Sequence, residues 1–257
     1  MVWMMAQEDV SNYTNTRSSF IATWKWRLRF DVIGHHPRLF FAIYRHHPIE
    51  KAFIVTDDTE VVLEGFPRAA NTFMVLAFQL AQERKVKVAH HTHVPAQLTR
   101  AVSFGLPAIV SVREPIDAVT SLKIFDPKIS SSTYLSSYIG YHTYLESISD
   151  SVIIATFEDI TLNFGSVILA MNDKFGTEFS AFSGSSQAVE KVYQAIEKIG
   201  LEKTGRSGIG VSKPDPRKEV LKEDIRPGIA KEPLLGEANR IYLQLRNNSR
   251  DRVLAED

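Results

Sequence analysis

A turn between a strand and a helix holds the residues best suited to bind an anion. The stretch VVLEGFPRAANTF, residues 61–73, runs from a buried β-type segment through a tight turn into a helical pattern. The first N–H groups of a helix have no acceptor within it, so they and the helix dipole favour an anion. Arg68 adds a positive charge, and Asn71 and Thr72 add polar side chains. We predict a phosphate site here, with a solvated arginine on an ordinary turn as the alternative.

A second junction of the same kind is IVSVREPIDAVTSL, residues 109–122. Arg113 follows the buried strand, and Ser121 comes eight residues later on the expected helix. Pro115 suits the first turn of that helix, and Asp117 suits its dipole. Arg113 and Ser121 are therefore expected to converge on one oxyanion, the first from the strand end and the second from the helix.

Short β-type runs alternate with helical patterns, which predicts an α/β fold. The runs VVLEG, KVKVAHHTH, PAIVSV and SVIIATF have the apolar character of strands buried on both faces of a parallel sheet. We expect a single three-layer α/β/α domain over residues 1–257 with a mostly parallel central sheet. Helices are expected near residues 71–84, 116–124, 132–148, 162–175, 185–199 and 234–248.

Other segments carry weaker signals. Residues 1–18 are polar and expected to be poorly ordered, and residues 19–48 are expected to form one or two short helices broken at Pro37 and Pro48. The stretch AFIVT-DDT-EVVLEG, residues 52–65, predicts a β-hairpin with an acidic turn. The Gly-, Pro- and charge-rich segment 203–233 predicts a long loop.

The composition argues against several classes of protein. The chain has 30 Lys and Arg residues against 30 Asp and Glu residues, so no nucleic-acid partner is expected. It has no cysteine, which excludes a disulfide framework, a thiolate nucleophile and a Cys-based zinc site. No stretch reaches the roughly 18 to 20 apolar residues of a transmembrane span, and the N-terminal stretch does not resemble a secretory signal. We therefore expect a cytoplasmic protein.

The aromatic and basic segment FIATWKWRLRF, residues 20–30, stands out near the N-terminus. We expect a helix packed on the core, with a helix that lies on a membrane surface as the alternative.

Four segments in order resemble the family of sulfotransferases that use 3′-phosphoadenosine-5′-phosphosulfate (PAPS). EGFPRAANTF resembles its 5′-phosphosulfate loop, and VSVREPIDAVTSL resembles its 3′-phosphate site, where Arg and Ser are likewise eight apart. HTHVPAQL resembles the segment that carries the catalytic base, and YLSSYIGYHTYLES with VIIATFEDI resembles a helix and the strand end after it. The similarity extends from about Val61 to Gly176. It departs from the family pattern at Ala69 and Ala70, where Ser and Gly are usual.

The resemblance implies the P-loop NTPase-like fold of the sulfotransferases. It also implies transfer of a sulfuryl group from PAPS to a hydroxyl or amine of a small-molecule or carbohydrate acceptor, with no metal required. His93 is implied as the general base, and Arg68 as the cation that stabilises the leaving oxygen. The residues implied to bind the donor are Arg68, Ala69, Ala70, Asn71, Thr72, Phe73, Arg113 and Ser121. Arg206 and Gly208 join them, because GRSGIGVSKP, residues 205–214, approximates the Arg-Lys-Gly-x-x-Gly loop near the C-terminus of the family.

Two rival functions stay open at this stage. A nucleotide-dependent kinase or other phosphotransferase on the same fold is the first, although the Gly-x-x-x-x-Gly-Lys-Ser/Thr pattern of common P-loops is missing. A non-catalytic protein that binds PAP (the desulfated product) or PAPS is the second. The segment from Lys203 to Lys218 has five basic residues against one acidic, and we expect it to cover the nucleotide.

Some of these residues have an alternative role. His90, His91 and His93 could be metal ligands instead, since His91 and His93 would share a face of a strand. Glu158 and Asp159 are expected to be structural rather than catalytic. The remaining pattern, Tyr134, Tyr138 and Tyr141 on one helical face, is expected to belong to the core.

Overall fold

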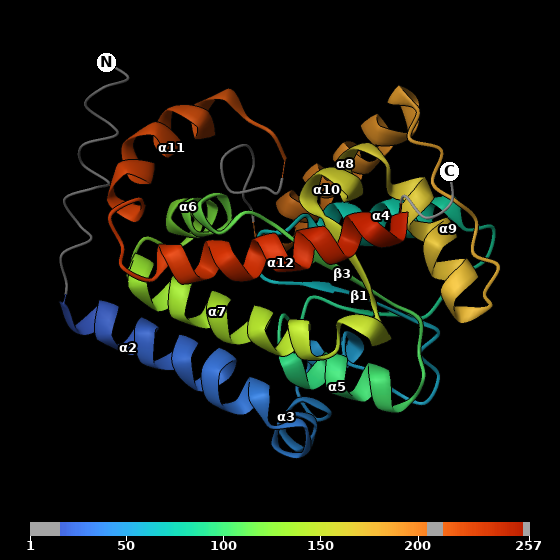
Figure 1. The fold of residues 1–257 in the computed structure, drawn as a ribbon, viewed down its shortest axis with the longest axis horizontal. Helices are drawn as coiled ribbons and strands as arrows, with labels where there is room; N and C mark the ends of the chain where they lie inside the picture. Colours follow the sequence, from blue (N-terminus) through green and yellow to red (C-terminus); the bar gives the residue numbers. More distant parts are fainter. Residues whose placement is uncertain (1–15, 205–212, 254–257) are drawn as a thin grey trace.

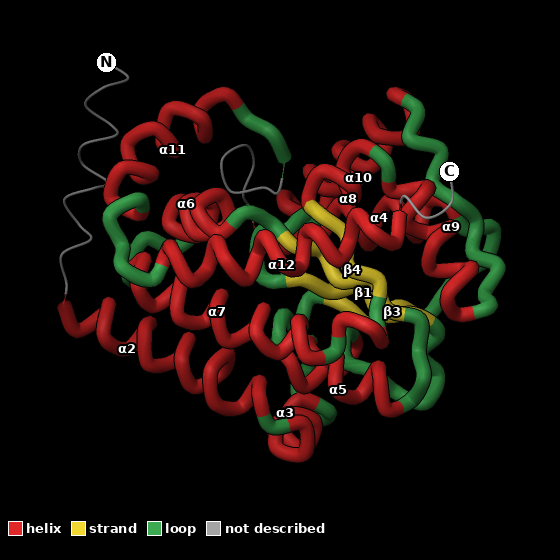
Figure 2. The backbone as a smooth tube through the Cα atoms, in the orientation of Figure 1, coloured by secondary structure: helices red, strands yellow, loops and turns green. Residues whose placement is uncertain are grey.

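The computed structural model describes residues 16–204 and 213–253. At its centre is a four-stranded sheet in the order β2-β1-β3-β4, in which all three neighbouring pairs are parallel. Helices cover both faces of this sheet (Figure 1), whose strands stand out in yellow in Figure 2. The expected α/β/α fold with a parallel sheet is confirmed. The strands are β1 (Val61–Gly65), β2 (Val88–His90), β3 (Ala108–Val112) and β4 (Ile153–Thr156).

Side chains alternate along the strands, so each strand feeds two separate clusters of buried apolar residues. In β1, Val62 belongs to one cluster, whereas Val61 and Leu63 belong to the other. In β3, Val110 and Ile109 divide in the same way. The sheet is therefore buried on both faces, as the apolar runs predicted. The helices of the first cluster are α5 (Pro95–Ser103), α6 (Pro115–Phe125), α7 (Ser131–Ser147) and α12 (Leu235–Val253), and those of the second are α4 (Asn71–Ala81), α8 (Phe157–Leu162), α9 (Phe164–Phe175) and α10 (Ser186–Thr204).

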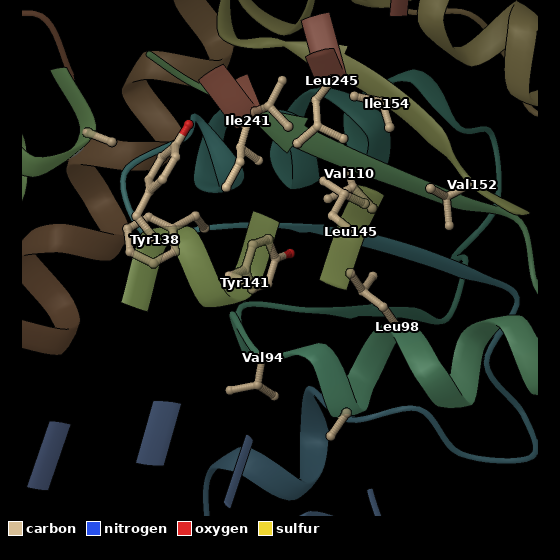
Figure 3. Packing of buried hydrophobic residues seen from close by; sticks show 14 of the residues in the cluster. Val94, Leu98, Val110, Tyr138, Tyr141, Leu145, Val152, Ile154, Ile241 and Leu245 are labelled. Atoms are coloured by element: carbon tan, nitrogen blue, oxygen red, sulfur yellow. The ribbon is translucent and has the colours of Figure 1, made fainter. Parts of the chain in front are cut away.

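Helix α7 occupies the middle of the first cluster. Its residues Tyr138, Tyr141 and Leu145 belong to the same cluster as Val110 of β3 and Leu245 of α12 (Figure 3). The tyrosine stripe is therefore part of the core, as predicted.

Two N-terminal helices form an outer layer over the first cluster, and the second of them contributes Phe40, Phe41 and Tyr44 to that cluster. Helix α2 (Thr16–Arg27) packs on α7, and α3 (Pro37–Tyr44) packs on α5. A π-turn over Leu28–Val32 and a 3₁₀ turn over Ile33–His35 join them. Pro37 occupies the first position of α3, where its missing N–H costs nothing, so the predicted break at this proline is confirmed.

The predicted hairpin is wrong. Its second half is β1, but its first half contains a 3₁₀ turn over Glu50–Ala52 and an extended stretch that is not a strand. Gln97 of α5 takes over the hydrogen bonds that a partner strand would have made. Its amide accepts from Val55 N at 3.0 Å and donates to Phe53 O at 2.9 Å, so the apolar run is buried without strand pairing.

The long loop predicted over 203–233 is also wrong for most of its length. Helix α10 continues to Thr204, and α11 spans Pro216–Ile229. Two of the prolines that suggested a loop belong to α11. Pro216 is at its first position after the N-cap Asp215, and Pro227 is in its last turn.

Three further segments differ from expectation or extend beyond it. Helix α2 begins at Thr16, inside the segment 1–18 that was expected to lack order, while residues 1–15 lie outside the described part of the chain. The sequence patterns did not predict α5 or α8. None of the helices in the described part combines the length and apolar character that a membrane span requires.

Candidate functional site

The site lies at the carboxyl edge of the sheet. Arg68 follows β1, His93 follows β2 and Arg113 follows β3. Because β2, β1 and β3 are adjacent and parallel, these three loops emerge side by side. This is the edge at which ligands bind in open α/β sheets.

The turn after β1 has two left-handed residues. Arg68 has φ = +73° and Ala70 has φ = +64°, a conformation that costs a residue with a side chain about 1–2 kcal/mol. Ala70 adopts it despite lacking the freedom of the glycine usual in the family. Two hydrogen bonds hold the turn: Ala69 N donates to Phe66 O at 3.2 Å, and the Ser111 hydroxyl donates to Ala69 O.

The turn points backbone N–H groups out of the start of α4. Among the described residues, the N–H groups of residues 70–73 have no hydrogen-bond acceptor. The side chain of Asn71 turns inward instead of facing this cradle, because its Nδ2 donates to Phe66 O at 2.9 Å. Phe73 packs against Phe182 and Tyr193. Asn71 and Phe73 therefore offer a ligand their N–H groups and not their side chains.

Gly65 allows β1 to end this close to β3. A Cβ atom at Gly65 would lie 2.6 Å from Ser111 O and 2.9 Å from Asn71 Oδ1, closer than side-chain atoms tolerate. Any larger residue would push the turn away from the sheet.

The two predicted anion-binding segments meet at Arg68. The Arg113 guanidinium donates from Nη1 to Arg68 O at 2.9 Å. The Arg68 guanidinium donates from Nε to the Ser121 Oγ at 2.9 Å. Residues 45 and 53 positions apart in the chain are thus brought into one hydrogen-bonded group, in which Arg113 bonds the backbone of Arg68 and Ser121 bonds its side chain.

The cations of this group repel one another in a poorly solvated setting. Burial, followed by the charge of Arg113, lowers the pKa of Arg68 to about 10. Burial also lowers the pKa of Arg113, against the opposing effect of Asp117 and Glu158. The guanidinium of Arg113 lies 4.2 Å from the ring centroid of Phe157, a cation–π contact. An arriving anion would relieve the repulsion.

Lys218 is a third cation beside the group, and no motif singled it out. It lies on α11, is only 7% exposed, and its Nζ donates to Lys213 O at 2.8 Å. Burial, followed by the charge of Arg68, lowers the pKa of Lys218 to about 8. Helix α11 packs on α6, and Arg226 pairs with Asp117 across that contact. The basic excess over 203–218 was the one signal for it in the sequence.

His93 carries a neutral imidazole of defined tautomer. Its Nδ1 lies 2.7 Å from Gly65 O. A carbonyl oxygen only accepts, so Nδ1 carries the proton and Nε2 keeps its lone pair. Burial, followed by the charge of His91, lowers the pKa of His93 to about 3, which keeps the ring neutral at physiological pH.

Glu64 fixes the His93 loop, and the sequence analysis did not identify it. Its carboxylate is fully buried and accepts from Thr92 N and Thr92 Oγ1, both at 2.8 Å, and from His93 N at 3.1 Å. His91 and His93 both have left-handed backbones, with φ of +58° and +59°. The hydrogen bonds to Glu64 offset that strain. A charged residue inside the apolar strand VVLEG was the available signal.

The other histidines do not form the metal site considered above. Strand β2 ends at His90, and the left-handed backbone at His91 removes the strand geometry that would have aligned His91 with His93. The His91 ring instead has a hydrogen-bond partner on each side. Its Nδ1 lies 2.7 Å from Nδ1 of His90, and its Nε2 lies 3.1 Å from Oγ1 of Thr72. Within residues 16–204 and 213–253, no three His, Asp or Glu side chains group as metal ligands.

The remaining candidates have simpler outcomes. Asp159 forms a capping box with Thr156 at the start of α8, and Glu158 is exposed in the same turn, so the structural interpretation of Asp159 is confirmed. Arg206 and Gly208 lie outside the described residues.

The fold is a three-layer α/β/α arrangement, and cationic side chains gather at the carboxyl edge of its sheet. No protein-family model matches the chain, and no curated protein matches it either. Among solved structures, it is similar to mouse sulfotransferase SULT7A1 complexed with PAP, with 10% sequence identity and a TM-score of 0.38. The match covers 80% of this chain and 90% of that chain. A likeness this distant does not define what this chain does.

The buried carboxylate of Glu64 predicts a pH dependence of stability. Burial raises its pKa from 4.5 to about 7, although the hydrogen bonds from Thr92 and His93 oppose the rise. Between these values the folded state binds more protons than the unfolded state, so the free energy of unfolding falls as pH rises. Urea denaturation should show that wild type loses about 2–3 kcal/mol relative to Glu64→Gln between pH 5 and pH 8.

Glu223→Gln, an exposed site on α11, is the matched control and should follow wild type. A difference between wild type and Glu64→Gln that stays constant from pH 5 to pH 8 would contradict the raised pKa.

Proposed function

We propose that this protein is a sulfotransferase that takes its sulfuryl group from PAPS. One observation carries the proposal: the bonds from Arg113 to Arg68 and from Arg68 to Ser121. They join the segment that resembles a 5′-phosphosulfate loop to the segment that resembles a 3′-phosphate site. A donor with phosphates at both positions matches such a double site.

The turn after β1 is suited to the 5′-phosphosulfate. The N–H groups of residues 70–73 and the dipole of α4 favour an anion at this point. Arg68 and Thr72 add a charge and a hydroxyl, and Lys218 adds a second charge from α11. Arg113 and Ser121 would bind the 3′-phosphate. The protein would then discriminate PAPS from nucleotides that lack this group.

The chemical step is an in-line displacement at sulfur. The acceptor oxygen or nitrogen forms a bond to sulfur while the bond from sulfur to the 5′-phosphate oxygen breaks, and PAP leaves. Negative charge grows on the leaving oxygen, where a preorganised cation lowers the barrier. Arg68 is suited to this role because it is half-buried and held by Ser121.

His93 is the group suited to take the acceptor proton. Its Nε2 carries a lone pair because Nδ1 donates to Gly65 O. Its pKa of about 3 in the ligand-free protein makes it a weak base, but a bound anionic donor raises the pKa of a neighbouring imidazole. Glu64 is a positioning residue, since its carboxylate accepts a hydrogen bond from the backbone N–H of His93.

The kinase alternative lacks comparable support. Common P-loops carry a lysine after the second glycine and a Ser or Thr for magnesium, whereas this turn reads EGFPRAANTF. Arg113 and Ser121 would also have no role toward a nucleotide without a 3′-phosphate.

Calorimetric titration with PAP tests the donor site. PAP should bind wild type more tightly than adenosine 5′-monophosphate, because only PAP has a 3′-phosphate. Arg113→Ala should weaken PAP by roughly ten- to a hundredfold, the range for a charge-assisted hydrogen bond, and should weaken the monophosphate much less, because there Arg113 acts only through its bond to Arg68 O. Arg113→Lys keeps the positive charge but loses the two-pronged donor geometry of the guanidinium. Its affinity for PAP should therefore lie between those of wild type and Arg113→Ala.

Arg84→Ala is the matched control, since Arg84 is exposed and pairs with Glu60. Failure of folded wild type to bind PAP would overturn the proposal and favour ATP with magnesium as the next ligand to test.

Transfer of label from radioactive PAPS tests whether the site is catalytic. Wild type, given a mixture of hydroxyl and amine acceptors, should label at least one of them. His93→Asn retains a donor for Gly65 O but loses the base, so its rate should fall roughly 10²- to 10⁴-fold while PAP affinity is unchanged. Because burial lowers the pKa of His93 to about 3 before the donor binds, its protonation should not lower kcat/KM for PAPS between pH 8 and pH 5.

The exposed His46 provides the control variant, His46→Asn. PAP binding without transfer to any acceptor would instead favour a non-catalytic PAP-binding protein, and full activity of His93→Asn would remove His93 from the mechanism.

A further inference from the structure

The outer layer formed by α2 and α3 exposes an unusual number of large apolar side chains. Phe20 is 72% exposed, Trp24 is 56% exposed and Ile49, in the turn after α3, is 66% exposed. Phe20 and Trp24 are four residues apart and share a face of α2. The exposed large apolar side chains of this layer are Phe20, Ile21, Trp24, Val32, Leu39, Ile43 and Ile49.

These side chains are not needed to pack the layer. Trp26 of α2 and Phe30 of the π-turn after it perform that task, since the Trp26 ring contacts Tyr134 and its Nε1 donates to the Ser137 Oγ at 2.9 Å. In α3 the buried residues are Phe40, Phe41 and Tyr44. The predicted core packing of residues 20–30 is therefore confirmed for one face and leaves the other face unexplained.

The exposed charges of the same layer are all positive. Between Ser19 and Lys51, both acidic side chains have partners: Asp31 accepts from Ser137 at 2.6 Å, and Glu50 pairs with Arg29 at 2.6 Å. Neither is fully exposed. The whole chain has equal numbers of acidic and basic residues, so this excess is a local segregation of charge. The exposed cations are Lys25, Arg27, Arg38, Arg45 and Lys51.

The two helices face outward on the same side of the molecule. Helix α2 packs on α7 and α3 packs on α5, and α5 and α7 belong to the same layer over the sheet. In Figure 1, α2 and α3 lie together along the lower boundary of the fold. We call the exposed apolar and basic side chains of residues 20–51 the outer basic face.

We propose that the outer basic face docks on a membrane surface that contains anionic lipid. Aromatic and aliphatic side chains enter the boundary between headgroups and acyl chains, and Lys and Arg reach the headgroups. A nucleic acid would meet the cations but would gain little from Ile43 and Ile49. A second copy of the chain would set cations against cations in a symmetric contact. An anionic lipid surface complements both properties of the face.

Flotation with lipid vesicles tests this proposal on the full chain. Wild type should bind vesicles of phosphatidylcholine with phosphatidylserine and should bind phosphatidylcholine vesicles far more weakly. Raising the salt to 1 M, where charges are screened beyond about 3 Å, should release it. The double variant Lys25→Gln with Arg27→Gln should lose about 25-fold in partitioning, about fivefold for each cation. Trp24→Ser should weaken binding without changing the salt dependence.

Leu162→Ser and Lys191→Gln are matched controls, since both residues are exposed on helices of the opposite layer. All the variants should bind PAP as wild type does, so failure here is distinct from failure of the donor site. Equal binding to both vesicle types would overturn the proposal, as would variants of the outer basic face that bind like wild type. A preference for single-stranded DNA over vesicles, or a dimer that Trp24→Ser dissociates, would replace it with another partner.

Discussion

The site depends on how a fully buried carboxylate, Glu64, is satisfied at the end of β1. A charge removed from water is costly unless hydrogen bonds replace its solvation. The donors here are Thr92 and His93 from the loop after β2, so the loop must approach the sheet for the charge to be tolerated. That approach holds His93 in a left-handed backbone and sets its Nδ1 on Gly65 O. Strain of this kind persists where surrounding contacts over-determine it.

The same edge imposes a second constraint through charge. Arg68, Arg113 and Lys218 come from three different segments, and each has a pKa lowered by burial. Folding therefore gathers cations in a place where they repel one another and where the N–H groups of α4 add to the positive potential. The arrangement costs stability in the absence of an anion, and an anionic ligand would recover that cost on binding. We regard this as the physical link between the fold and the proposed use of PAPS.

Much of this could be predicted from the sequence, because strand–helix junctions leave strong local signals. Arg68 and Arg113 each follow an apolar run and precede a helical pattern, and their loops meet because parallel neighbours end at one edge. What escaped prediction depends on contacts distant in sequence. The side chain of Gln97 accepts the hydrogen bond from Val55 N that a neighbouring strand would otherwise accept. The apolar run around Val55 is therefore a buried loop, although its sequence predicted one strand of a hairpin. Pro216 opens α11 rather than breaking it, so the segment that carries Lys218 was predicted as a loop.

A crystal structure of the protein with bound PAP would decide whether the carboxyl edge is a PAPS site. The 5′-phosphate should lie against the N–H groups of residues 70–73 and Arg68. The 3′-phosphate should lie within hydrogen-bonding distance of Arg113 and Ser121, with Lys218 of α11 beside the nucleotide. A nucleotide bound away from the carboxyl edge of β1 and β3, or one whose 3′-phosphate points into solvent, would contradict the proposed donor site.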